Sequence, residues 1–194
     1  NVSGRFGTSI AMSTDQRWLY IGEPGSDVVQ AYWTANIGAN AYYDRVTAFG
    51  TGTGNVGYSV KTNGSTIFVG APNATNEEVN NGNVYVFTRT SNAFALSNTL
   101  SSNWKNENAN FGASLAVDGT GGNLFVGIPG STQSGIYNGR VERYIKDGSN
   151  YVFNEYIEHP NEEIGNFGSS ISVSSDAVAL VVSSQGSSGR EETT

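Results

Sequence analysis

The 194-residue chain contains no cysteine. This absence excludes disulfides, thiolate metal sites and a cysteine nucleophile. Charged residues make up only 14% of the chain, and 10 Lys and Arg against 17 Asp and Glu give a net charge of −7 without any basic cluster. Because a phosphate backbone is bound mainly through clustered Lys and Arg, we do not expect the chain to bind nucleic acid.

Long apolar runs are also missing, and no charged segment followed by an apolar stretch opens the chain. A membrane helix needs roughly 18 or more consecutive apolar residues, so no membrane span is predicted. The chain begins at Asn1 without Met and ends on a polar stretch, 189–194. We therefore expect a processed or partial piece of a longer protein.

Glycine, in contrast, is abundant, with 25 of 194 residues, as is typical of a turn-dense all-β protein. A pattern of aromatic residue or Val, Gly, any residue, Ser and an aliphatic residue occurs four times, at 6–10, 56–60, 111–115 and 167–171. A second signature, Gly-x-Pro, follows the first three copies at 22–24, 70–72 and 127–129. The fourth copy has Leu-Val-Val-Ser-Ser at that place, 180–184, and has lost both Gly and Pro.

Apolar residues alternate with polar ones between these signatures, which predicts four antiparallel strands in each copy. The first strands are expected within 9–12, 59–60, 114–117 and 170–173. The second strands are the apolar runs that end at Gly-x-Pro, and their continuous hydrophobicity predicts burial on both faces. The third strands are expected at 28–33, 84–87 and 141–145, and the fourth at 42–49, 94–100 and 151–157.

Each copy would form one blade whose two apolar faces need neighbouring blades to cover them. The predicted fold is therefore an all-β β-propeller of four-stranded blades. We place the blades at about 5–50, 55–101 and 110–159, with a partial fourth at 166–194. Propellers close with about four to eight blades. The remaining blades would lie on a longer chain or a second copy, or else an unusual four-bladed ring closes by borrowing a strand.

The stretch from Gly70-Ala71-Pro72 through Val84–Phe87 to Phe111-Gly112 resembles the FG-GAP repeat of integrin α-subunit propellers and of microbial surface proteins. The resemblance implies a role in adhesion, ligand recognition or assembly, and it does not imply catalysis. We interpret the signature residues as architectural: Phe6, Gly7, Gly22, Pro24, Gly57, Gly70, Pro72, Phe111, Gly112, Gly127, Pro129, Phe167 and Gly168.

In integrin-type propellers, several loops between the first and second strands bind calcium through an Asp-x-Asp-x-Asp-Gly-x-x-Asp pattern. A calcium site needs several converging oxygen ligands. Here each of these loops has at most one carboxylate, namely Asp15, Asp118 or Asp176, and the second loop has none. We therefore expect no bound metal and no cofactor.

The residues give little support for catalysis. The single histidine, His159, precedes Pro160 after a predicted strand, and no serine or aspartate signature accompanies it. A surface loop residue is the expected interpretation. A pair of converging carboxylates stays open as an alternative, because acidic side chains occur in several loops: Glu23, Asp27, Asp44, Glu77 and Glu78. We predict a protein that is not an enzyme.

Loops that join the second strand to the third, and each blade to the next, should emerge on one face of the propeller. We name Trp104, Tyr137, Glu23 and Asp27 as candidate ligand-binding residues on these loops. Rigid aromatics dominate interfaces, but Trp104 has an alternative role in packing over a blade rim. Asn-x-Ser/Thr sequons make Asn63 and Asn73 candidate glycosylation sites, and Asn1 also begins a sequon.

The predicted function is a non-enzymatic binding or adhesion module, cell-surface or secreted, that recognises protein or glycan through one propeller face. The alternative is a structural subunit or scaffold of a large extracellular or virion assembly. Adhesion predicts one free, loop-bearing face, whereas a structural role predicts apolar contacts on several sides.

Overall fold

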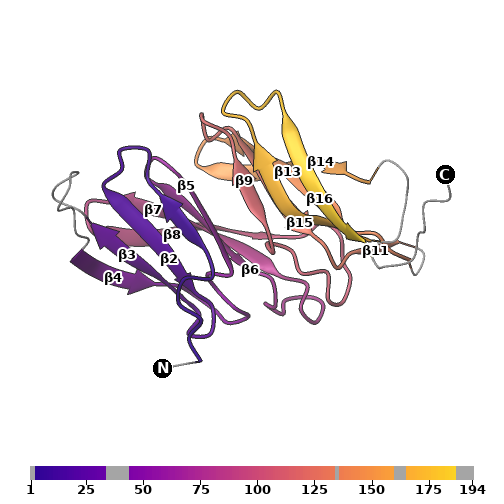
Figure 1. Cartoon of the computed structure of the whole chain (residues 1–194), viewed down its shortest axis with the longest axis horizontal. Coiled ribbons are helices and arrows are strands. Elements are labelled where there is room, and N and C mark those ends of the chain that lie inside the picture. The colour runs from indigo at the N-terminus through magenta and orange to yellow at the C-terminus, as the bar shows by residue number, and fades with distance from the viewer. Residues whose placement is uncertain (1–2, 34–43, 134–135, 160–164, 187–194) are drawn as a thin grey trace, which may run out of the picture.

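The computed structural model describes residues 3–33, 44–133, 136–159 and 165–186. Within these residues the regular structure is entirely β, arranged as three four-stranded sheets and two two-stranded sheets (Figure 1). The predicted all-β class is therefore confirmed. Parts of some predictions lie outside the described residues: positions 42–43 of one strand, the sequon at Asn1, Pro160, and 187–194 of the partial blade.

The three four-stranded sheets follow chain order, one for each complete copy of the repeat. The first sheet contains β1 (Ile10–Met12), β2 (Trp18–Glu23), β3 (Val28–Trp33) and β4 (Asp44–Phe49). The second contains β5 (Ser59–Asn63), β6 (Thr66–Ala71), β7 (Asn83–Thr90) and β8 (Ala93–Ser101). The third contains β9 (Leu115–Val117), β10 (Asn123–Ile128), β13 (Arg140–Asp147) and β14 (Asn150–Ile157).

Two smaller sheets complete the described structure. The fourth copy of the repeat forms β15 (Gly165–Val173) and β16 (Leu180–Gly186), which pair with each other. A short hairpin, β11 (Thr132–Gln133) and β12 (Ile136–Tyr137), lies in a segment that the sequence predicts to be a loop. Strands of two residues are too short to produce a detectable alternation, which is why this hairpin is missed. We refer below to the sheets as blades one to four.

Every four-stranded blade is an antiparallel meander with the same irregularity. The pairing of the third strand with the fourth shifts register after Ala31, Val86 and Arg143, each the fourth residue of its strand. Such bulges increase local twist. The second strands end one residue before Pro24, Pro72 and Pro129, as predicted, since proline cannot donate to the ladder.

Burial of the second strands follows the prediction in blades two and three only. All but the first residue of β6 and of β10 are buried. In β2, buried positions instead alternate with half-buried ones, so the prediction of two buried faces is wrong there. The reason is the position of blade one at the end of the stack. Among the described residues, another blade packs against only one of its two faces.

The hydrophobic core is divided into three layers, each lying between two consecutive blades. The first layer joins Trp18 and Tyr20 of blade one to Val60 and Ile67 of blade two. The other two layers join blade two to three and blade three to four in the same manner. No blade has a core of its own, and each one is stabilised by its neighbours, as in other repeat architectures.

The repeated signatures place the same polar contact at each of the three blade boundaries described. The hydroxyls of Ser9, Ser59 and Ser114 donate to the carbonyl oxygens of Gly57, Gly112 and Gly168 in the following blade, at 2.8, 2.6 and 2.6 Å. These three glycines have φ values of +91°, +87° and +90°, which other residues rarely adopt. We call this serine-to-glycine contact the blade latch.

Second-strand glycines make the latch possible. An ideal Cβ built on Gly22, Gly70 or Gly127 would overlap the carbonyl oxygen that the latch serine binds in the next blade. The two backbones therefore approach as closely as only glycine permits. The structure thus places these glycines at the boundaries between blades.

Phe6 differs in burial from the aromatic residues that precede two of the other anchor glycines. Phe111 and Phe167 are buried, with exposed fractions of 0% and 7%, but Phe6 is 54% exposed and contacts only the ring edge of Tyr32 among the aromatic side chains described. The described residues include no blade that would cover it.

Candidate functional site

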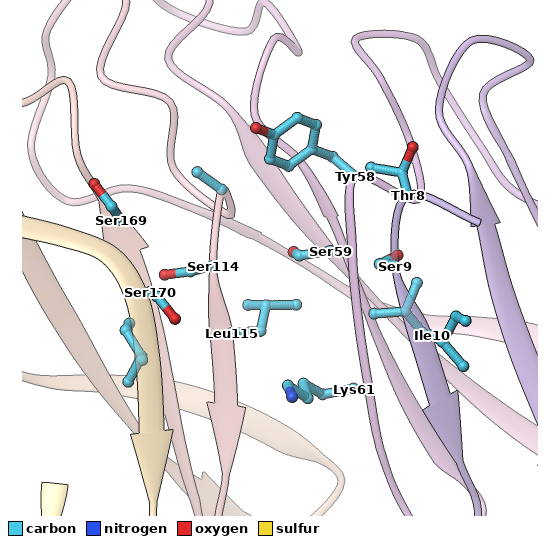
Figure 2. Close-up of a pocket in the computed structure, with 13 residues that line it drawn as sticks. Thr8, Ser9, Ile10, Tyr58, Ser59, Lys61, Ser114, Leu115, Ser169 and Ser170 are labelled. Atoms are coloured by element: carbon cyan, nitrogen blue, oxygen red, sulfur yellow. The ribbon is translucent and has the colours of Figure 1, made fainter. Parts of the chain in front are cut away.

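The first strands of the four blades lie side by side and line an open groove of about 400 Å³ (Figure 2). We call it the axial groove. Its lining contains Thr8, Ser9, Ile10, Tyr58, Ser59, Val60, Lys61, Ala113, Ser114, Leu115, Ser169, Ser170 and Ile171. Figure 2 shows the labelled serines and Lys61 around the same open space.

The chemistry of the axial groove is limited by how its hydroxyls are used. Ser9, Ser59 and Ser114 donate to glycine carbonyls in the blade latches. Lys61 is the charged residue of the lining, which contains no histidine or carboxylate. The groove therefore lacks both the histidine base and the pair of carboxylates on which common hydrolytic sites depend.

A second polar surface consists of two loops that brace each other, 73–82 and 102–110. We call it the loop platform. Backbone hydrogen bonds cross between the loops from Asn108 N to Val79 O at 2.8 Å and from Asn110 N to Asn80 O at 3.2 Å. The Asn80 side chain donates to that of Asn108 at 2.9 Å. These contacts fix the two loops relative to each other.

Charged and amide side chains extend the bracing of the loop platform. Lys105 pairs with Glu77 at 3.1 Å, and both side chains are exposed. Asn110 donates to the carbonyl of Pro72 at 3.3 Å. Beside the platform, Tyr58, Asn110, Pro129 and Asn166 line a pocket of about 320 Å³ that shares Tyr58 with the lining of the axial groove. The platform therefore presents exposed polar groups on a fixed backbone.

Trp104 lies in the loop platform and packs against the third blade. Its ring centroid is 3.6 Å from the guanidinium carbon of Arg140, and its indole N–H donates to the carbonyl of Thr132 at 3.0 Å. The ring of Tyr156 meets it edge-on at 6.1 Å. These contacts agree with the alternative role of Trp104 in packing against a blade. A ligand contact by Trp104 stays a prediction.

Arg140 and Glu142 form a buried polar cluster beneath Trp104. Arg140 is 1% exposed and pairs with Glu158 at 3.4 Å. Glu142 is fully buried, and its carboxylate accepts hydrogen bonds from the Ser102 hydroxyl at 2.8 Å, the Asn103 N–H at 3.0 Å and the Tyr144 hydroxyl at 2.6 Å. Glu142 thereby holds the first residues of the platform loop against β13.

Burial raises the pKa of Glu142, and hydrogen bonds from Tyr144, Ser102 and Asn103 offset part of that rise. Both carboxylate oxygens already accept hydrogen bonds, so the role of this group in the structure is to hold the platform loop. The sequence offers one signal for this cluster, the two charged residues flanking Val141 in an apolar strand. Sequence reasoning misses it because such residues usually face solvent.

The other candidate residues lie in blade one and between blades. Glu23 ends β2 and accepts hydrogen bonds from Ser26 and Gln30 at 2.9 and 2.7 Å. Asp27 accepts the backbone N–H of Val56 at 2.9 Å and so ties the first blade to the second. Tyr137 belongs to β12, but its side chain lies outside the described residues, as does that of Asp44. The structure thus places Glu23 and Asp27 in a different blade from the surroundings of Trp104.

The carboxylates of the turns between first and second strands are engaged within their own turns. Asp15 accepts from Ser13 and Arg17, and Asp176 from Ser174 and Val178; these hydrogen bonds lower the pKa of both groups. Burial raises the pKa of Asp118, but hydrogen bonds from Asn123, Thr120 and Gly122 outweigh it and lower the pKa overall. Among the described residues, no three His, Asp or Glu side chains gather as metal ligands.

His159 follows β14, and its ring meets the Phe167 ring edge-on at 5.5 Å. Of the two candidate glycosylation sites, Asn73 is exposed, whereas the Asn63 side-chain nitrogen donates to the carbonyls of Asp118 and Gly119 at 2.9 Å each. Asn63 therefore links the hairpins of blades two and three. Within the described part of the chain there is no helix with the length and hydropathy of a bilayer span.

No protein-family model and no curated protein matches the chain. Solved structures do. A provisionally assigned 6-phosphogluconolactonase from Bacteroides uniformis matches with a TM-score of 0.66 and 10% identity, over 90% of this chain and 46% of that one. One from Bacteroides fragilis matches with a TM-score of 0.62 and 15% identity, over 89% and 46%.

The β-propeller domain of Cps50 (Swd1) from Myceliophteria thermophila also matches, with a TM-score of 0.59 and 12% identity, over 91% of this chain and 49% of that one. The fold is that of a β-propeller. At these identities the likeness extends to the fold alone. The chain spans about half the length of the propellers it matches, so a ring of that size requires additional blades besides those described.

Proposed function

We propose that the chain is part of a non-enzymatic binding propeller of FG-GAP type, cell-surface or secreted, that recognises protein or glycan through its loop platform. The bracing of the platform carries this proposal. Four of these contacts hold loops 73–82 and 102–110 together, while the side chains of Glu77, Lys105 and Asn108 stay exposed. A surface that is already ordered loses little conformational entropy on binding.

The axial groove supports the non-enzymatic part of the proposal. Its latch serines donate to backbone carbonyls, and its lining has no histidine or carboxylate. Glu142 is buried beneath the platform, where its carboxylate accepts hydrogen bonds from three donors and has no exposed surface. The FG-GAP assignment is supported by the anchor glycines and the Gly-x-Pro strand ends, which occupy equivalent places in three blades.

The binding role is tested by exposing the fluorescently labelled chain to a glycan array and to intact cells. We expect saturable binding that is reduced by the double substitution Glu77→Ala and Lys105→Ala, because it removes exposed platform groups without touching a blade layer. Lys61→Ala in the axial groove is the matched control and should bind normally. Absence of saturable binding by the folded chain, or loss of binding in the control alone, contradicts the proposal.

The enzyme alternative is tested with the substrate class that the names of two similar structures suggest. We expect no hydrolysis of 6-phosphogluconolactone above the spontaneous rate. Turnover that scales with the concentration of the purified chain would show that the propeller is catalytic.

A scaffold role in an extracellular or virion assembly is the second candidate, and exposed apolar side chains on the outer strands favour it. Leu96, Val152 and Tyr156 on β8 and β14 are 45%, 46% and 36% exposed. Exposed apolar residues are common when they occur singly, so it is the presence of several on the outer strands that favours this role. If this role holds, Leu96→Ser with Val152→Ser should abolish concentration-dependent assembly in light scattering and leave ligand binding unchanged.

A further inference from the structure

The face of blade one that points away from blade two is bare at positions that are covered in every other blade. Ile10 is 60% exposed, whereas the residues at the same place in the repeat, Val60, Leu115 and Ile171, are 2%, 2% and 6% exposed. In blades two to four, the preceding blade provides that cover through the hydrophobic layers. Blade one therefore has the residues of a blade boundary without its partner.

Gly7 likewise lies at a blade-latch position that has no partner blade among the described residues. It has the φ of an anchor glycine, +89°, yet an ideal Cβ built on it meets nothing within 4 Å. At Gly57, Gly112 and Gly168 the same test meets backbone atoms of the preceding blade. Phe6, 54% exposed, precedes Gly7 as buried Phe111 precedes Gly112. The receiving half of a fourth latch is thus formed on blade one.

The three complete latches show what the preceding blade must contribute, which we call the giving half of the latch. It consists of a first-strand serine, a second-strand glycine that admits the anchor carbonyl, and an aromatic residue two positions before that glycine. The aromatic residues at these positions are Tyr20, Phe68 and Phe125, and all three are buried. Any blade that docks on Gly7 in the same geometry needs this set.

Blade four departs from this set in two of its three members. Ser170 is present, but it pairs with Ser183, which occupies the register of Gly22, Gly70 and Gly127. Where those glycines leave room for an anchor carbonyl, Ser183 has a Cβ, and its hydroxyl accepts the Ser170 N–H at 3.0 Å. Two residues earlier stands Val181, 69% exposed, in place of the aromatic residue.

We propose that the bare face of blade one is the docking surface for a further blade of this repeat that carries the serine, the glycine and the aromatic residue. Ser183 and Val181 exclude the fourth repeat of a second copy of the chain from that surface. Blade four of a second copy therefore does not dock on blade one, and the blade that does so is of the kind seen in the first three repeats.

The experiment converts blade four into a giving blade within the full chain. Because the chain has no cysteine, Met12→Cys places a single thiol on the bare face, where Met12 is 48% exposed. Its rate of reaction with a maleimide is measured over a range of protein concentrations in three backgrounds: the natural sequence, Val181→Phe with Ser183→Gly, and Val181→Phe with Ser183→Ala. The last two differ by one methyl group.

We expect concentration-dependent protection of the thiol, with oligomers in sedimentation velocity, only in the glycine background. Adding Ile10→Asp there should abolish it, and adding Ser170→Ala should weaken association by roughly threefold to tenfold, the loss of one hydrogen bond. Circular dichroism checks that each variant is folded.

Three results overturn the proposal. Protection in the natural sequence would show that Ser183 and Val181 do not exclude a second copy. Equal protection in the alanine and glycine backgrounds would show that the Cβ at position 183 is not decisive. A folded glycine variant whose thiol reacts at the same rate at every concentration would show that the bare face does not receive such a blade.

Discussion

Single glycines set the distance between neighbouring blades, because a methyl group at these positions would overlap backbone that has no room to move. Gly70 is an example, since an ideal Cβ built on it would lie only 2.0 Å from the carbonyl oxygen of Gly112. We expect Gly70→Ala to lower the free energy of unfolding by about 1–3 kcal/mol through overpacking. Urea denaturation measures the change.

Gly186→Ala is the control for that substitution. It lies at the end of β16 with nothing within 4 Å of its Cβ, so its effect should stay within about 0.5 kcal/mol. Equal losses for the two variants would show that the close approach between blades is not what makes Gly70 necessary.

The buried Glu142 carboxyl predicts an unusual pH dependence. Its pKa in the folded state lies above the ordinary value of 4.5, chiefly because of burial. Protonation therefore favours the folded state, and this contribution to stability is complete below about pH 4.5 and is lost as pH rises through the folded pKa. We expect Glu142→Gln to remove this decline.

The measurement is the unfolding free energy of the natural chain minus that of Glu142→Gln, followed upward from about pH 4. The difference should fall as pH rises. Asp118 provides the contrast because its pKa is lowered from 3.8, so the corresponding difference for Asp118→Asn should instead fall as pH drops below about 4. A Glu142 difference that grows with pH contradicts the assignment.

At the scale of elements, the blade latch connects the first strand of one blade to the turn before the first strand of the next. Ser59→Ala removes the donor to the Gly112 carbonyl, which is 2.6 Å away. We expect a loss of about 1–2 kcal/mol, since the carbonyl is left without this partner. Ser170→Ala is the matched control at the same repeat position, and it should cost much less because no anchor carbonyl accepts the Ser170 hydroxyl among the described residues.

The strands themselves follow closely from the sequence. Val28–Trp33 is predicted and observed with the same bounds, because alternation and the flanking Gly-x-Pro define it locally. The candidate site is less predictable. The acceptor of each latch serine lies about 50 residues away, as for Ser59 and Gly112, and which atoms meet across that separation depends on how blades stack. The same holds for Arg140 beneath Trp104.

At the scale of the whole molecule, division of the core into three layers predicts a gradient of stability. In the described part of the chain, blades two and three are covered on both faces, whereas blades one and four are each covered on one. We expect backbone amides of β6 and β10 to exchange with deuterium more slowly than those of β2 and β16, because local opening is easiest where fewest apolar contacts are lost. Mass spectrometry of peptides from the exchanged chain measures this order, and slowest exchange in β2 would contradict it.

The layers also determine how the molecule would respond to mechanical force. Each layer joins one pair of consecutive blades. Tension applied between residues 3 and 186 would therefore act on the three layers one after another along the stack. Each would rupture as a separate event, releasing about one repeat of chain at a time. A pulled chain would therefore extend in steps, and its resistance to shear would come from many small contacts distributed along the stack.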